Sequence, residues 1–173
     1  MMKKGCDKVQ LLPDVLVQEH LVDEETAKLG AVSVLELIDK QIAKPRSEFI
    51  WEIYLDEYKQ DSTLPEAFTR CADAILKFAG VSYMSTRVSI MNLGDAPILP
   101  MHQDIFEGSR SLLTLAGFKD VRFAHPELEA AHTQVSIGPG DAYTMIFRND
   151  DTSLEHEVEY CFGDNIVIYI DHD

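Results

Sequence analysis

The sequence predicts an α+β protein, in which a jelly-roll barrel of antiparallel strands carries N-terminal helices packed on one sheet. Two observations lead to this fold class. Before Gly80 the chain holds two segments whose apolar residues recur at helical spacing. After Gly80 the chain consists of eight short segments with the residue pattern of β-strands, separated by turn residues. Eight short strands that follow two helices are typical of a jelly roll, in which two sheets enclose a core.

The first helix is expected over residues 23–43. Asp23 can cap its N-terminus, acidic residues fill its first turn, and Pro45 stops it. Its buried stripe is expected to be formed by apolar residues at near-helical spacing, namely Leu29, Val32, Leu35 and Ile42.

The second helix is expected over residues 64–79. Thr63 and Glu66 form a capping box, Pro65 suits the first turn, and Gly80 suits the C-terminal cap. Its apolar stripe needs a surface to pack on and consists of Phe68, Cys71, Ala72, Ile75 and Leu76. Residues 48–58, between the helices, are compatible with either helix or strand.

The segments expected as strands are residues 85–93, 97–104, 111–118, 120–126, 133–137, 141–148, 155–162 and 165–171. In the last one, alternate residues are apolar on both faces, with Ile166 and Ile168 on one face and Val167 and Tyr169 on the other. Such a strand is covered on both faces, here by the barrel interior and by the helices. We expect a single domain over residues 1–173, helical over about 20–80 and a barrel over about 81–171.

Composition narrows the possible partners and the compartment. The net charge of −15 would repel a phosphate backbone, and no basic cluster offsets it, so a nucleic-acid partner is not expected. There is no apolar run near 18 residues and no secretory signal, so no membrane association is expected. Cys6, Cys71 and Cys161 are isolated from one another, which fits reduced thiols in the cytoplasm.

The segment PMHQDIF contains a possible pair of metal ligands. In a strand, residues i and i+2 point to the same face, so His102 and Asp104 can reach one cation together. The spacing proves little by itself in a chain with 6 histidines and 30 acidic residues, and His125 with Glu127 repeats it. A non-haem iron site needs two histidines and one carboxylate, so a third ligand has to be found.

His156 is the best third ligand, because it opens a strand late in the barrel. A rival set consists of His125 and Glu127 with either His132 or His156. It is weaker, because residues 125–132 have a composition typical of a loop or a surface turn of helix. His172 is expected to fray near the end of the chain, and His20 is expected to be exposed. The residues therefore favour a metal triad of His102, Asp104 and His156.

The stretch from about 12 to 170 resembles the Fe(II)/2-oxoglutarate-dependent oxygenase superfamily. LVQEHLVDEETAKLG is similar to its opening strand and first helix, and RVSIMNLGDAPILPMHQD to its strand, turn and His-x-Asp. IGPGDAYTMIF and LEHEVEYCFGDNIVIYI are similar to its Pro-Gly-Asp strand, distal histidine and final strand. The resemblance implies a double-stranded β-helix with His102, Asp104 and His156 as the iron ligands.

The resemblance also implies a binding site for 2-oxoglutarate, and this chain departs from the family pattern there. Many members have an arginine for the distal carboxylate where this chain has Asn165. An amide cannot form the charge-assisted bidentate pair of an arginine. Some members instead place a basic residue on a strand after the His-x-Asp. Lys119 and Arg122 have that position, with Arg122 favoured because its neighbours indicate a strand. Met91 stands where the family often has tyrosine or asparagine; the remaining cations to consider are Arg87, Arg110 and Arg148.

The activity implied by the resemblance is that of an Fe(II)- and 2-oxoglutarate-dependent dioxygenase (hydroxylase). Such an enzyme couples reaction of O2 and decarboxylation of 2-oxoglutarate to hydroxylation of a C–H bond. Because the carboxylate of Asp104 is present, hydroxylation is preferred to halogenation. A small metabolite or an amino-acid side chain of a peptide is the expected substrate. Arg110 and Glu107 are candidate substrate contacts, and Asp95 with Glu107 could bind an amine or a guanidinium.

Two other functions stay open at this point. The first is a non-haem iron oxygenase or oxidase that does not use 2-oxoglutarate, in which Asn165 would be no departure. The second is a non-catalytic ligand-binding β-barrel, in which His102 and His156 are ordinary structural histidines. Metal content separates the barrel from the enzymes, and succinate release separates the two enzymes.

Overall fold

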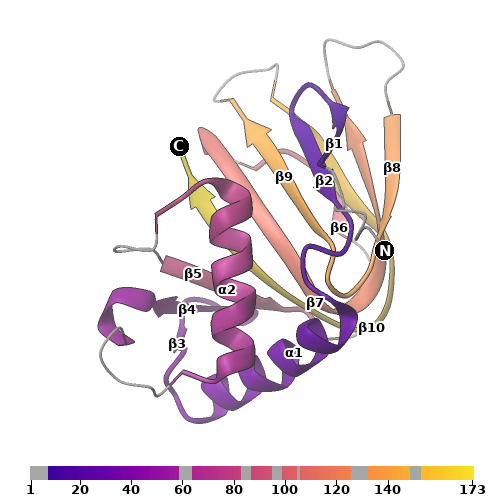
Figure 1. The fold of residues 1–173 in the computed structure, drawn as a ribbon. Coiled ribbons are helices and arrows are strands. Elements are labelled where there is room, and N and C mark those ends of the chain that lie inside the picture. Colours follow the sequence, from indigo (N-terminus) through magenta and orange to yellow (C-terminus); the bar gives the residue numbers. More distant parts are fainter. Residues whose placement is uncertain are drawn as a thin grey trace, which may run out of the picture.

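The computed structural model describes residues 8–58, 64–82, 87–94, 99–104, 106–125, 132–148 and 153–173. It is mostly antiparallel β-sheet with two α-helices, consistent with a jelly roll (Figure 1). The strands are β1 Val9–Leu12, β2 Val15–Gln18, β3 Lys44–Pro45, β4 Ile50–Tyr54, β5 Arg87–Asn92, β6 Leu99–His102, β7 Gly108–Ala124, β8 His132–Ile137, β9 Ala142–Phe147 and β10 Glu155–His172. The helices are α1 Glu24–Asp39 and α2 Glu66–Ala79, and η1 Leu55–Tyr58 is a 3₁₀ turn.

Two long strands, β7 and β10, organise the sheet and pair antiparallel along most of their length. The first half of β7 pairs with β9 and with the end of β10, which in turn pairs with β5. The second half of β7 pairs with β8 and with the start of β10, which in turn pairs with β6. Each long strand therefore contributes to both sets of strands.

The long strands bend at glycines where the sequence predicted strand ends. Gly117 in β7 and Gly163 in β10 have φ values of 84° and 77°, which are accessible to glycine at little cost. A Cβ at residue 117 would also collide with the carbonyl group of Asp164. The expected strands 111–118 and 120–126 are therefore one bent strand, β7, and 155–162 and 165–171 are one bent strand, β10.

The N-terminal part contributes strands as well as helices, so residues 20–80 are not purely helical. The β1–β2 hairpin, which precedes that range, adds to β9, and within the range β3 and β4 add to β5. The ambiguous segment 48–58 forms β4 followed by η1. Its strand pairs with β5, about forty residues away, a long-range contact that a local pattern does not contain.

Helix α1 begins as expected but buries a different face. The Asp23 side chain accepts a hydrogen bond from the Thr26 N–H at 2.7 Å, and the helix ends at Asp39 rather than at 43. The expected stripe is exposed, with exposed fractions of 53% for Leu29, 56% for Val32 and 44% for Leu35. The buried face instead carries small residues and two larger apolar ones, namely Thr26, Ala27, Gly30, Ala31, Ser33, Val34 and Leu37.

The small residues of α1 allow it to approach α2 closely. A Cβ at Gly30 would lie 2.8 Å from the Cys71 Sγ on α2, so only glycine fits here without movement. The stripe expected on α2 is buried, and Gly80 closes this helix in the left-handed conformation with φ 74°. Thr63, half of the expected capping box, lies outside the described residues.

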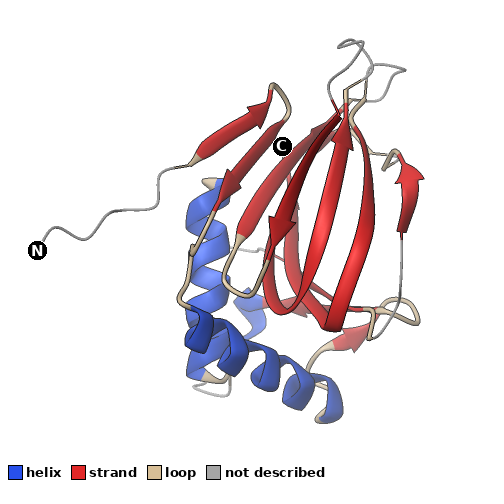
Figure 2. Ribbon diagram, turned by 90° about the vertical axis from the view of Figure 1, so that its right-hand side faces the viewer, coloured by secondary structure: helices blue, strands red, loops and turns tan. Residues whose placement is uncertain are grey.

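The final strand β10 separates two apolar clusters. Ile166, Ile168 and Ile170 share a cluster with α1 and α2, and Figure 2 shows both helices on one side of the sheet. Val167 and Tyr169 belong to the cluster between the strands. The candidate site is on the side of this second cluster. Within the described part of the chain, no helix is long and apolar enough to cross a membrane.

Candidate metal centre

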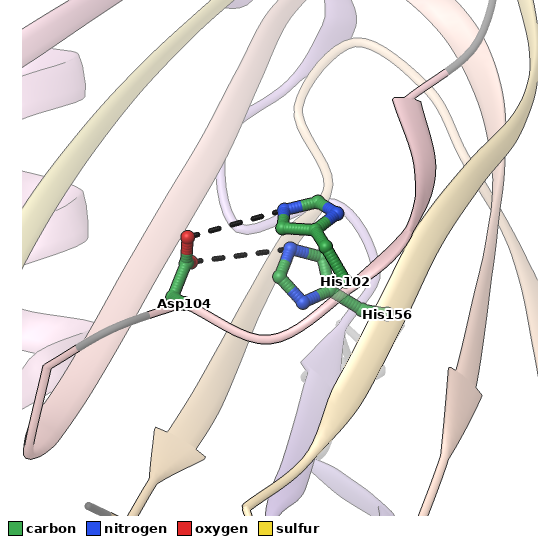
Figure 3. A group of neighbouring side chains, drawn as sticks. All are labelled: His102, Asp104 and His156. Carbon is green, nitrogen blue, oxygen red and sulfur yellow. Dashed lines mark ion pairs between the residues drawn. The ribbon is translucent and has the colours of Figure 1, made fainter.

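Three side chains that the sequence predicted as a set lie together in the structure. His102 is the last residue of β6, Asp104 follows two residues later, and His156 is the second residue of β10. His102 and His156 are direct partners in the β6–β10 ladder, which brings residues 54 positions apart side by side. Figure 3 shows the three side chains pointing toward one another.

The possible ligand atoms of this trio lie close to one another. One atom from each residue lies within 4.8 Å of the others. Asp104 Oδ1 is 3.9 Å from His102 Nε2, and Asp104 Oδ2 is 4.0 Å from His156 Nε2. Both distances are too long for hydrogen bonds. Two ligand bonds of about 2.1 Å each span up to about 4.2 Å. The trio could therefore hold one ion between its members.

The backbone of β6 fixes the tautomer of His102. Its Nδ1 lies 2.7 Å from the carbonyl oxygen of Pro100. A carbonyl oxygen only accepts hydrogen bonds, so Nδ1 donates and carries the proton. In the neutral ring the lone pair is then on Nε2, the atom that faces Asp104. This arrangement is typical of metal-binding histidines.

His156 is kept neutral by its surroundings. Burial lowers its pKa to about 3, and the neighbouring charges of His102 and Arg110 act in the same direction. Its Nδ1 is buried and has no hydrogen-bond partner among the described residues. A histidine must be deprotonated to bind a metal, so His156 is in the state that a metal needs across the physiological pH range.

The lowered pKa of His156 makes the stability of the metal-free protein depend on pH. The folded-state value of about 3 lies below the ordinary value of 6.5, so between these pH values only the unfolded chain gains this proton. The neutral His156 side chain therefore makes its full contribution to the free energy of unfolding above pH 6.5. As the pH is lowered toward 3, this contribution decreases by up to about 1.4 kcal/mol per pH unit.

Urea unfolding over this pH range checks the expectation. His156→Gln removes the titrating group, so the free energy of unfolding of this variant should depend less steeply on pH than that of the wild type. Equal slopes in the two proteins would contradict the assignment of a depressed pKa to His156.

Arg110 holds the carboxylate of Asp104 in position. Its Nη1 donates to Asp104 Oδ2 at 2.8 Å, while Nε and Nη2 donate to Asp171 at 2.7 and 3.1 Å. Its guanidinium also lies over the rings of Phe106 and Tyr169. Burial alone would lower the pKa of Arg110, but the hydrogen bonds to Asp171 and the charges of both aspartates raise it. Such outer contacts orient metal-ligating carboxylates.

An enclosed cavity of about 80 Å³ opens on the trio. Apart from the trio and Arg110, its polar lining residues are Lys119, Tyr143 and Asn165. Lys119 is only 5% exposed, and its Nζ lies 5.8 Å from the centre of the Tyr143 ring. A volume of this size holds roughly five to eight water-sized groups. The cavity therefore has room for a few small groups of a ligand.

The residues expected to bind the co-substrate are only partly in this cavity. Met91 and Asn165 line it, whereas Arg122 is not among its lining residues and forms an ion pair with Glu157. Lys119, Val121 and Phe123 alternate along β7 and are buried, and Arg122 lies on the opposite face. The apolar neighbours of Arg122 indicated a strand correctly, but their alternation also excludes Arg122 from the face that they share.

Most of the other charged candidates have partners elsewhere. Arg148 forms a bidentate pair with the buried Asp14, which also contacts His125. Arg87 pairs with Glu52. Glu107 is exposed and is not among the residues that line this cavity. Asp95, Glu127 and the side chain of His132 lie outside the described residues.

A second, more open pocket of about 450 Å³ meets the cavity at His102 and Asp104. The two share Met91, Leu93, Leu99, His102, Asp104 and Arg110. The remaining lining residues of the open pocket are Tyr169, three residues of the turn between β3 and β4, and the first residue of β4. The turn residues are Arg46, Ser47 and Phe49, and the β4 residue is Ile50. No feature of the sequence marked this turn as part of a site.

Comparisons with known proteins show a likeness in fold. No protein-family model matches the sequence, and no curated protein matches it. Among solved structures, a Pseudomonas putida prolyl-4-hydroxylase matches with a TM-score of 0.54 and 13% identity, over 92% of each chain. The structure of OsALKBH1 matches with a TM-score of 0.57 and 12% identity, over 95% of this chain and 100% of that one. The chain therefore resembles these two proteins in the arrangement of almost its entire length.

Proposed function

We propose that this protein is an Fe(II)- and 2-oxoglutarate-dependent dioxygenase that hydroxylates a small metabolite or an amino-acid side chain. The observation that carries the proposal is the convergence of two histidines and one carboxylate at the mouth of a cavity that holds a buried lysine. The two solved structures of similar fold are both Fe(II)/2-oxoglutarate oxygenases, which supports the same general chemistry here.

The metal in this proposal is Fe(II), held by His102 Nε2, His156 Nε2 and one oxygen of Asp104. Two histidines and a carboxylate are the ligand set of non-haem iron oxygenases, which leave the other metal positions open. When bound, the iron supplies the activation of O2 coupled to decarboxylation of 2-oxoglutarate. The residues of this chain position the ligands and shield the site. Arg110 orients the carboxylate of Asp104, and the apolar residues that line the cavity limit access of water.

The co-substrate in this proposal extends from the trio into the enclosed cavity, with its distal carboxylate on Lys119. Asn165 replaces the arginine of many similar enzymes, but Lys119 brings a positive charge to the same cavity. A hydrogen bond to a charged group contributes about 1.5–3 kcal/mol, against about 1 kcal/mol for a neutral one. Lys119 can therefore supply the charge that Asn165 lacks, and Asn165 can add a neutral hydrogen bond. This role replaces the one expected of Arg122.

The experiment that tests the proposal is an assay of succinate release. The protein is incubated with Fe(II), 2-oxoglutarate and O2, and each component is omitted in turn. These enzymes commonly turn over slowly without their main substrate, so we expect succinate that depends on all three components. Iron binding without any succinate would instead favour an iron oxidase that does not use 2-oxoglutarate.

A further inference from the structure

The open pocket beside the trio has a composition that selects one class of ligand. Its walls are mainly apolar or aromatic, and one of them, Phe49, is 45% exposed. An exposed aromatic side chain at a pocket is available to cover the apolar part of a ligand. Among the described residues that line this pocket, Asp104 is the single acid, and Arg110 already binds it.

The same pocket also has a positively charged side chain in its lining. Arg46 lines it, with a side chain that is 49% exposed, and its Nη1 lies 3.3 Å from Glu52 Oε1. Arg87 Nη1 lies at the same distance from the same oxygen. Glu52 is thus shared by two guanidinium groups, so Arg46 does not have this carboxylate to itself.

The turn that carries Arg46 is held by backbone hydrogen bonds. The N–H groups of Arg46 and Ser47 donate to the carbonyl oxygen of Ile50 at 2.8 and 3.1 Å. The Phe49 carbonyl oxygen accepts from the Asn92 N–H at 3.0 Å, which ties the turn to β5. The backbone that carries Arg46 and Phe49 is thus fixed before any ligand arrives, which lowers the cost of ordering the site on binding.

We propose that the open pocket is the substrate site and that the substrate is an amphipathic carboxylic acid. Its apolar chain or ring lies between Phe49, Leu93 and Leu99, and its carboxylate pairs with Arg46. Naming the pocket a substrate site rests on the proposed function, whereas the preference for an amphipathic carboxylate rests on the pocket alone. The absence of a free acid among the described lining residues makes an amine or guanidinium substrate, considered above, the disfavoured choice.

The test uses three probes of equal chain length, namely octanoate, 1-octanol and octylamine. Their binding to the full chain as purified is measured near neutral pH by ligand-observed NMR titration. We expect octanoate to bind most tightly and octylamine least tightly. Arg46→Gln should weaken octanoate about three- to fivefold, the range of an exposed ion pair, and leave 1-octanol unchanged. Arg87→Gln is the matched control, because Arg87 shares the Glu52 partner but does not line the pocket; octanoate affinity should not change.

Four results would overturn the proposal. The first is that octanoate does not bind, and the second is that octylamine binds as tightly as octanoate. The third is that the Arg46 and Arg87 variants change octanoate affinity equally. The fourth is that Lys119→Met loses octanoate affinity, which would place the acid in the enclosed cavity. The assay needs no turnover. Succinate release without Arg46-dependent octanoate binding would keep the oxygenase and reject this substrate class. The reverse pattern would keep the pocket and reject the oxygenase.

Discussion

Asp104→Ala is expected to reduce iron affinity by about 100-fold or more and to abolish iron-dependent turnover. Loss of even an outer contact to a metal ligand costs about 10- to 100-fold in affinity, and this variant removes a ligand itself. Asp104 lies between both histidines, 3.9 Å from His102 and 4.0 Å from His156. Iron content after dialysis and succinate formation are the two measurements.

Two features keep this prediction specific. The variant leaves Arg110 paired with Asp171, so the fold should be retained, which circular dichroism can verify. Asp39→Ala, which removes an exposed acid on α1, is the control and should bind iron as the wild type does. An Asp104→Ala protein that keeps wild-type iron affinity would remove this residue from the metal site.

Lys119→Met is expected to raise the KM for 2-oxoglutarate by roughly 10- to 100-fold while iron binding is retained. This range corresponds to the loss of a charged hydrogen bond worth about 1.5–3 kcal/mol. Steady-state kinetics with varied 2-oxoglutarate measures it. Because Lys119 is 5% exposed, methionine fills a similar space without a buried charge.

Arg122→Met is the informative comparison for Lys119→Met. Arg122 lies on the face of β7 opposite to Lys119 and pairs with Glu157 of β10. Its replacement should therefore leave the KM for 2-oxoglutarate near the wild-type value. A large effect at Arg122 with none at Lys119 would show that the co-substrate does not use the enclosed cavity as proposed.

The sequence predicted the candidate ligands because their signal is local. His102 and Asp104 are two residues apart, and His156 follows a turn and opens a strand, so strand alternation and strand position suffice to select them. Their convergence depends on the β6–β10 register, which pairs His102 with His156. No local pattern contains that register, and the family resemblance supplied it.

The parts that the sequence did not predict depend on tertiary contacts. Helix α1 has two stripes at helical spacing, and the more apolar one, with Leu29 and Val32, is exposed. The close approach of Cys71 to Gly30 selects the other stripe, and this contact joins residues 41 positions apart. The bends at Gly117 and Gly163 resembled strand ends for a similar reason, since a glycine in a strand signals a bend and a break alike. Alternation along the strand could have shown that Lys119, and not Arg122, shares a face of β7 with the apolar residues Val121 and Phe123.

The most direct test of the central claim is an anaerobic titration of the Fe(II)-loaded protein with 2-oxoglutarate, followed by visible absorbance. Chelation of Fe(II) by the oxo acid produces a weak charge-transfer band that neither component shows alone. We predict that the band appears in the wild type, saturates, and requires higher 2-oxoglutarate concentrations in Lys119→Met. A wild-type protein that binds iron but gives no band would contradict the claim that this site uses 2-oxoglutarate.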